Sequence, residues 1–243
     1  MIKTRTYLAG LALAGMASAA YADLTVTPAV VSDYDFRGIT QSAKDPALQV
    51  GVDWSTGPVH LGAWTSNIDF STPHGFYGSQ HTELDLIGDY SFGSDQTVKY
   101  NTGIVYYLYP GQTDNNTPEV WFMGSKGWFS ATLHYSWDWF SLGNDPKRNE
   151  WYAEANGTWP IGGKDSGFGL TAHYGYNGGE YFKATYKEFA DYSIGLTKSL
   201  GNFNLALKYI SNDGPKLQIP GNILLNAKRA VFSVSTTLPW SKE

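Results

Sequence analysis

Residues 128–139 read WFSATLHYSWDW, and apolar and polar side chains alternate along the whole stretch. Because successive residues of a β-strand point to opposite faces, Phe129, Leu133 and Trp139 would share one face. The polar residues between them, such as Thr132 and Asp138, would share the other face. The stretch therefore predicts a strand that separates an apolar environment from a polar one.

The same period of two divides the chain after residue 22 into twelve expected strands. Long polar connections follow the odd-numbered strands and short ones follow the even-numbered strands. Bacterial outer-membrane barrels have this arrangement of long extracellular loops and short periplasmic turns. In a soluble β-sandwich, long and short connections are not expected to alternate from one strand to the next. The sequence thus predicts an all-β, twelve-stranded antiparallel transmembrane barrel. The strands are expected at residues 26–39, 47–55, 58–69, 82–92, 97–108, 118–125, 127–138, 149–159, 167–176, 190–199, 202–210 and 226–238.

Aromatic residues make up 16 % of the chain, yet the mean hydropathy is −0.31. They gather near both ends of the expected strands, as the two aromatic girdles of a membrane barrel would. An aromatic core of a lectin-like sandwich would explain their number but not their placement. The expected girdle residues are Trp54, Phe92, Trp128, Trp159 and Phe203 beside the short turns, and Phe36, Tyr106, Tyr107, Tyr109, Trp137, Trp139, Trp151, Tyr174, Tyr176 and Tyr192 beside the long loops.

Residues 1–22 have the features of a secretory signal peptide. Lys3 and Arg5 precede an apolar run that is too short to span a bilayer, and small residues lead to Ala22. We expect residues 23–243 to form the barrel in the outer membrane, after export through the periplasm. Cleavage would change the net charge from −5 to about −7, which argues against a nucleic-acid partner. The chain has no cysteine, which excludes disulfides and cysteine-bound metals.

The end of the first expected strand reads VVSDYDFRGITQS. If that strand continues through this stretch, Asp33, Asp35 and Arg37 face the barrel interior, and Tyr34 and Phe36 face lipid. The polar side would then be the inside of the barrel.

The residues expected to line the lumen include more acids than bases. Such an excess predicts a mild preference for cations among small hydrophilic solutes or ions. The alternative is that these charges pair with one another and plug the barrel. The acidic set is Asp33, Asp35, Asp53, Glu83, Asp85, Asp89, Asp138 and Glu154, and the basic set is Arg37, Lys99, Lys208 and Arg229.

Two other classes of protein stay open as alternatives to a channel. An occluded barrel with a structural or adhesin-like binding role would have the same strand pattern. A barrel hydrolase is less favoured, because His134 and Ser136 lie two apart on one strand, which rarely gives nucleophile–base geometry. No phosphate-binding loop, EF-hand or zinc spacing occurs, so we expect no enzyme activity, cofactor or metal. The solute and the oligomeric state are left open, and membrane lipid is the expected surrounding.

Five segments, in order along the chain, resemble the TorF family of porins. The resemblance implies an outer-membrane β-barrel of a Gram-negative bacterium that passes small solutes, and it assigns no functional residues. One departure is that Ser241, Lys242 and Glu243 follow the last in-phase aromatic residue, Trp240. The segments are VSDYDFRGITQSAKDPALQVGVDW (31–54), LGAWTSNIDF (61–70), TELDLIGDYSF (82–92), GIVYYLYPG (103–111) and AVFSVSTTL (230–238).

Overall fold

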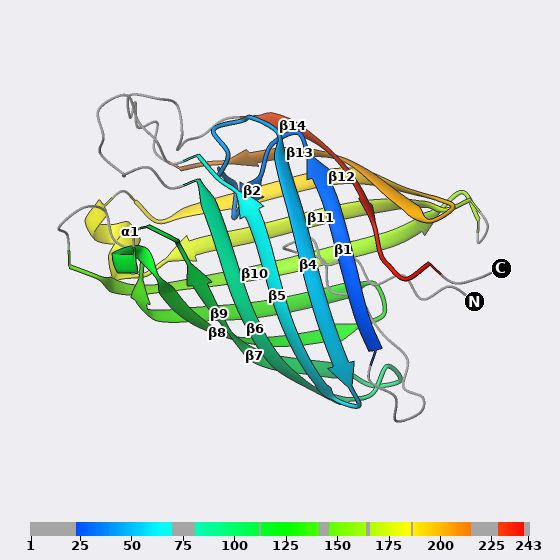
Figure 1. Ribbon diagram of the computed structural model, residues 1–243, viewed down its shortest axis with the longest axis horizontal. Coiled ribbons are helices and arrows are strands. Elements are labelled where there is room, and N and C mark those ends of the chain that lie inside the picture. The colour runs from blue at the N-terminus through cyan, green and yellow to red at the C-terminus, as the bar shows by residue number, and fades with distance from the viewer. Residues whose placement is uncertain are drawn as a thin grey trace.

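The computed structural model describes residues 23–69, 81–111, 113–140, 146–163, 166–185, 187–214 and 228–240. In these residues twelve antiparallel strands form a closed barrel, in which strands adjacent in sequence pair and β1 closes the barrel against β14 (Figure 1). The prediction of a twelve-stranded barrel is confirmed. The strands are β1 (Asp23–Val31), β4 (Ala47–Thr56), β5 (Val59–Asn67), β6 (Thr82–Gly93), β7 (Lys99–Leu108), β8 (Thr117–Lys126), β9 (Phe129–Trp139), β10 (Arg148–Ile161), β11 (Phe168–Gly178), β12 (Phe189–Leu200), β13 (Phe203–Asn212) and β14 (Arg229–Thr236).

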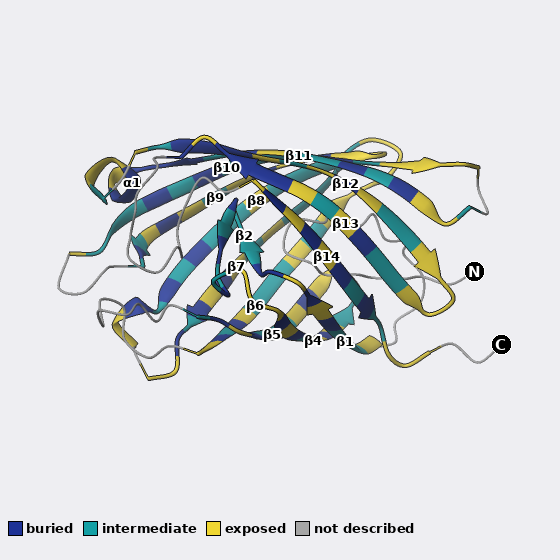
Figure 2. Cartoon of the chain, turned by 90° about the horizontal axis from the view of Figure 1, so that it is seen from above, coloured by how far each residue is buried: buried dark blue, intermediate teal, exposed yellow. Residues whose placement is uncertain are grey.

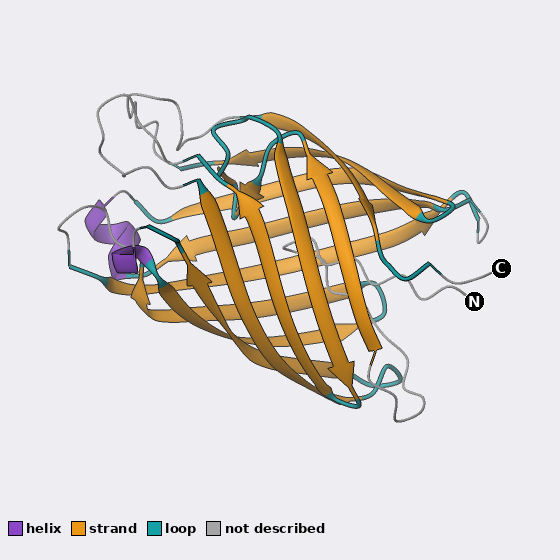
Figure 3. Ribbon diagram, viewed as in Figure 1, coloured by secondary structure: helices purple, strands orange, loops and turns teal. Residues whose placement is uncertain are grey.

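The short and long connections lie at opposite ends of the barrel. Three of the short turns begin with a glycine at positive φ, at Gly57, Gly127 and Gly201, which suits the tight turns that join twisted antiparallel strands. The long connections contain the 3-10 helix η1 (Thr113–Asn115) and the helix α1 (Glu180–Thr185), which lies at the long-loop end in Figure 3. No helix in the described ranges is long and apolar enough to span a membrane. The expected signal peptide lies outside the described residues.

Exposed and buried residues alternate along most strands, as Figure 2 shows. Outward apolar side chains such as Leu133 and Ile104 are exposed, whereas inward polar side chains such as Thr132 are buried. This arrangement reverses that of a water-soluble protein and suits a barrel surrounded by lipid. The expected girdle aromatics with exposed side chains are Trp54, Phe92, Trp128, Trp159 and Phe203 near the short turns, and Tyr106, Trp137, Tyr174 and Tyr192 near the long loops.

The first expected strand ends earlier than predicted. β1 stops at Val31, and the following residues form a small separate hairpin of β2 (Asp35–Phe36) and β3 (Ile39–Thr40). Tyr34 is only 4 % exposed, and Phe36 packs against buried interior residues. The prediction that Tyr34 and Phe36 face lipid is therefore wrong, because the alternating pattern continues past the point where the chain leaves the wall.

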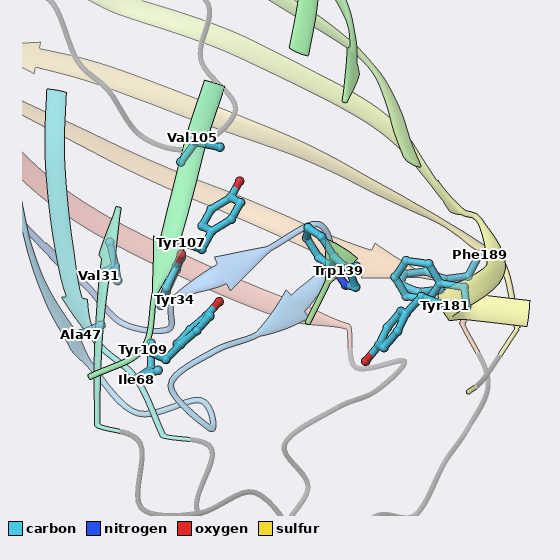
Figure 4. Close-up of a cluster of buried hydrophobic side chains, with 11 residues drawn as sticks. Val31, Tyr34, Ala47, Ile68, Val105, Tyr107, Tyr109, Trp139, Tyr181 and Phe189 are labelled. Carbon is cyan, nitrogen blue, oxygen red and sulfur yellow. The ribbon is translucent and has the colours of Figure 1, made fainter. Parts of the chain in front are cut away.

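An apolar cluster joins this hairpin to the inside of the barrel wall (Figure 4). Tyr34 packs edge-on against Trp64 of β5, and Phe36 lies edge-on to Tyr107 and stacks on Trp139. Three aromatics predicted for the outer girdle, Tyr107, Tyr109 and Trp139, belong to this cluster and point inward, so their prediction is wrong. The cluster comprises Val31, Tyr34, Ala47, Ile68, Val105, Tyr107, Tyr109, Trp139, Tyr181, Phe182 and Phe189.

Candidate functional site

The turn of the β2–β3 hairpin carries an arginine that forms two ion pairs with the barrel wall. Arg37 Nη2 donates to both carboxylate oxygens of Glu119 at 2.7 Å, and Nη1 donates to Glu150 Oε1 at 2.9 Å. Glu119 and Glu150 are each the third residue of a strand, β8 and β10, that enters the barrel from the long-loop end. Both glutamates are fully buried. The hairpin is thus fixed to one side of the wall near that end.

Aromatic rings surround the same guanidinium group. The carbon Cζ of Arg37 lies 4.4 Å from the ring centre of Tyr152, 4.8 Å from Phe36 and 5.2 Å from Trp139. Cations within about 6 Å of a ring face are attracted by the ring quadrupole, more strongly when they are desolvated. The guanidinium therefore has carboxylates around its edge and rings against its faces.

The other side of the hairpin is fixed to β13 and β14. Arg229 pairs with Asp35 and donates to the carbonyl oxygen of Gly38, and its Nε lies 2.7 Å from Asp33 Oδ2, outside hydrogen-bond geometry. The Asn212 side-chain amide also donates to the Gly38 carbonyl, at 2.7 Å. Attachments on β8 and β10 and on β13 and β14 hold the hairpin across the barrel interior, where Figure 2 shows it.

Alternating acids and histidines extend along the inside of the wall from the Arg37 site. Glu119 contacts His134 at 2.9 Å, and His134 contacts Glu154 at 3.4 Å. His173 lies 3.6 Å from Glu154 and 2.8 Å from Asp191. This row crosses five neighbouring strands, β8 to β12, so the carboxylates on this part of the wall have imidazole or guanidinium partners.

Two carboxylates of β6, Glu83 and Asp85, have a different environment. Glu83 and Asp85 are buried, and among the described residues neither forms an ion pair within 4.0 Å. Glu83 Oε2 and Asp85 Oδ1 have no hydrogen-bond partner, although the Tyr109 hydroxyl lies 3.5 Å from the other oxygen of Glu83. These two carboxylates therefore have no basic side chain within ion-pair distance among the described residues.

A third polar cluster lies nearer the short turns. His60 contacts Asp53 at 2.9 Å and Asp89 at 2.5 Å, which links β4, β5 and β6. The side-chain amide of Asn101 on β7 donates to Asp89 at 2.6 Å. In turn, the indole N–H of Trp121 donates to Asn101 at 2.5 Å. Asp53 and Asp89 thus share a histidine, unlike Glu83 and Asp85.

The structure places the twelve expected lumen residues in several groups. Asp35 and Arg37 lie in the hairpin and Asp33 just before it, so none of the three lies in a wall strand. Asp138 lies at the long-loop end of β9, 3.3 Å from Lys147. Lys99 is the first residue of β7, in phase with the buried Val105 and Tyr107. The remaining members are Asp53, Glu83, Asp85, Asp89, Glu154 and Lys208 on inward faces of wall strands, and Arg229 at the start of β14.

Among the described residues, three buried acids of the interior were not predicted. Glu150 lies in phase with Glu154 on the same strand, so the alternation was sufficient to identify it. Glu119 and Asp191 lie near the starts of their expected strands, where the phase of a short segment is hard to fix. Within the described part of the chain, no group of three or more histidine, aspartate or glutamate side chains is arranged to hold a metal ion.

Comparison with solved structures identifies porins of the same fold. The KdgM porin aligns with a TM-score of 0.54 at 8 % identity, over 89 % of this chain and 99 % of that one. The NanC porin aligns with a TM-score of 0.53 at 9 % identity, over 88 % and 98 %. A further structure, the KdgM porin in complex with disordered oligogalacturonate, gives 0.53 at 8 % identity, over 91 % and 100 %. At such low identity these likenesses concern the fold alone.

Comparison of the sequence itself gives a family but no characterised relative. No curated protein matches the chain. A family described as "Bacterial protein of unknown function (Gcw_chp)" matches residues 15–238, which is most of the chain. The chain therefore belongs to the Gcw_chp family of bacterial proteins.

Proposed function

We propose that the chain is an outer-membrane channel for small hydrophilic solutes, with a mild preference for cations. The observation that carries the proposal is the closed barrel with an apolar outer face and a charged inner face. The porin folds of KdgM and NanC and the resemblance to the TorF family of porins support the same function. Export by a signal peptide at residues 1–22 and insertion into the outer membrane are part of the proposal.

The cation preference depends on acids that lack a basic partner. Glu83 and Asp85 on β6 fit this requirement, whereas Glu154 is shared by two histidines. A carboxylate attracts a monovalent cation about 4 Å away by about 1 kcal/mol even in bulk water. The twelve lumen residues therefore do not contribute equally, and we assign the selectivity chiefly to Glu83 and Asp85. An acidic solute such as the oligogalacturonate of the KdgM complex would be repelled by them.

The hairpin narrows the path through the barrel at the long-loop end. Its attachments to β8, β10, β13 and β14 favour a small conductance. The same observation favours a second candidate function, an occluded barrel with a structural or binding role. The two differ in whether the unmodified protein, with the hairpin in place, conducts ions.

Planar-bilayer recording of the refolded protein in a salt gradient tests the proposal. The unmodified protein should give a reversal potential of cation-selective sign, and E83Q/D85N should shift it toward anions. D53N/D89N is the matched control, because it also removes two inward carboxylates, which already share a histidine partner, so its shift should be smaller. Anion selectivity of the unmodified protein, or equal shifts in the two variants, would contradict the assignment.

A further inference from the structure

The hairpin turn places an arginine where the backbone favours smaller residues. Arg37 and Gly38 are its two central residues, and their φ angles are 51° and 80°. Two-residue turns with both φ angles positive favour asparagine, aspartate or glycine at the first position, because longer side chains without a local hydrogen bond are strained there. A strained residue of this kind indicates a role for its side chain. The role of Arg37 therefore lies in what its guanidinium contacts.

The barrel wall supplies most of the surroundings of that guanidinium. Glu119 and Glu150 accept its hydrogen bonds, and Trp139 and Tyr152 present their rings at 5.2 and 4.4 Å. Phe36, the third ring, comes from the hairpin itself. Carboxylates that accept bidentate hydrogen bonds, together with aromatic faces, are how proteins hold organic cations. The wall alone thus has the chemistry of a guanidinium-binding site.

One acceptor of this site is unused. Glu150 is fully buried, and its Oε2 has no hydrogen-bond partner, whereas its Oε1 accepts from Arg37. A buried carboxylate oxygen without a donor is costly. A guanidinium that is free of the chain could turn another of its N–H groups toward this oxygen, which Arg37 in its present position does not.

We propose that Glu119, Glu150, Trp139 and Tyr152 bind solutes that carry a guanidinium group, and that Arg37 occupies this site as an internal competitor. The proposal rests on the proposed channel function, for which it names a class of solute. A solute that displaces Arg37 would also release one of the two attachments of the hairpin. Because Arg37 is tethered to the site by a short segment, its effective concentration is of the order of millimolar or higher. To displace Arg37, a solute must therefore bind with enough affinity, at its own concentration, to outcompete this effective concentration.

Emptying the site tests the proposal without relying on transport. In detergent, titration calorimetry should detect saturable binding of ethylguanidinium chloride to R37A, and weaker binding to the unmodified protein, where Arg37 competes. Sodium chloride at the same ionic strength should not reduce the binding of ethylguanidinium. The matched control is R37A/E150Q, which keeps the rings and Glu119. It should bind about tenfold more weakly, because it lacks one charged hydrogen-bond acceptor.

Further outcomes separate this site from the channel. If R37A does not refold, R37K replaces it in the binding experiment. The lysine ammonium group keeps the positive charge but lacks the paired N–H donors of the guanidinium, so it should compete less well for the site. Ethylguanidinium should then bind R37K more tightly than the unmodified protein. No binding to folded R37A, equal binding to R37A and R37A/E150Q, or equal affinity of R37K and the unmodified protein would overturn the site. Binding of ethylguanidinium without ion conductance would support the guanidinium site and contradict the channel. Cation conductance without ethylguanidinium binding would support the channel and contradict the guanidinium site.

Discussion

Replacement of Leu133 by arginine tests the assignment of inside and outside on which every interior residue depends. Leu133 is 54 % exposed, and its neighbours across the sheet are Phe122 and Ala153. It is the fifth residue of β9. With a rise of about 3.4 Å per residue and a tilt of about 40°, it lies about 10 Å above Phe129 along the membrane normal. In an apolar band about 25 Å tall, that position is close to the middle.

An arginine at mid-membrane depth on the lipid face costs about 2–4 kcal/mol of unfolding free energy. L133R should lose this amount. T132R is the matched control, because Thr132 is one residue away, 8 % exposed, and points inward. Its cross-strand partner is Glu154, a carboxylate that an arginine at this position could contact. T132R should therefore lose less than L133R.

Equilibrium unfolding by urea from lipid vesicles, followed by tryptophan fluorescence, measures both losses. L205R and N204R repeat the comparison on β13, where Leu205 and Asn204 lie on opposite faces. Equal losses within each pair, or a larger loss for the inward variants, would refute the assignment of the faces.

Three further predictions concern the hairpin and the selectivity. R37M should lose about 3–5 kcal/mol of unfolding free energy because it leaves two buried glutamates unpaired, and neutralising both glutamates in the same variant should recover part of the loss. G38A should lose more than G57A in the same unfolding assay. Both positions have positive φ, but a Cβ at Gly38 would lie 2.5 Å from Cβ of Asp191, whereas a Cβ at Gly57 would meet no atom within 4 Å. The cation preference in reversal-potential measurements should weaken between 0.1 M and 1 M salt, because the Debye length falls from about 10 Å to about 3 Å. Losses of equal size for G38A and G57A, no loss for R37M, or a preference that does not change with salt would contradict these predictions.

The barrel could be predicted from the sequence because its two signals are local. Alternation within segments such as residues 128–139 fixes the strands, and the length of each connection fixes the end of the barrel at which it lies. The hairpin could not be predicted in this way, because the charged and aromatic residues from Asp33 to Arg37 alternate as a wall strand would. The one local sign was Gly38, which marks a tight turn inside the expected strand of residues 26–39.

The interior contacts required the three-dimensional arrangement. Arg37 meets Glu119 and Glu150, which lie 82 and 113 residues away in sequence. The inward position of Trp139 follows from these contacts, because its ring packs on Phe36 and the guanidinium rather than on lipid. Which acids have a basic partner likewise depends on the neighbouring strands and not on their own segment.

Single-channel recording of the unmodified protein beside a variant without the hairpin tests the proposed channel most directly. Val31 and Ala47 are cross-strand partners, so a short turn of about four residues could replace residues 32–46 and still join β1 to β4. We expect a small cation-selective conductance for the unmodified protein, and a several-fold larger conductance of the same selectivity for the variant. If the unmodified protein conducts no ions, whether or not the variant does, the hairpin-bearing barrel is not a channel.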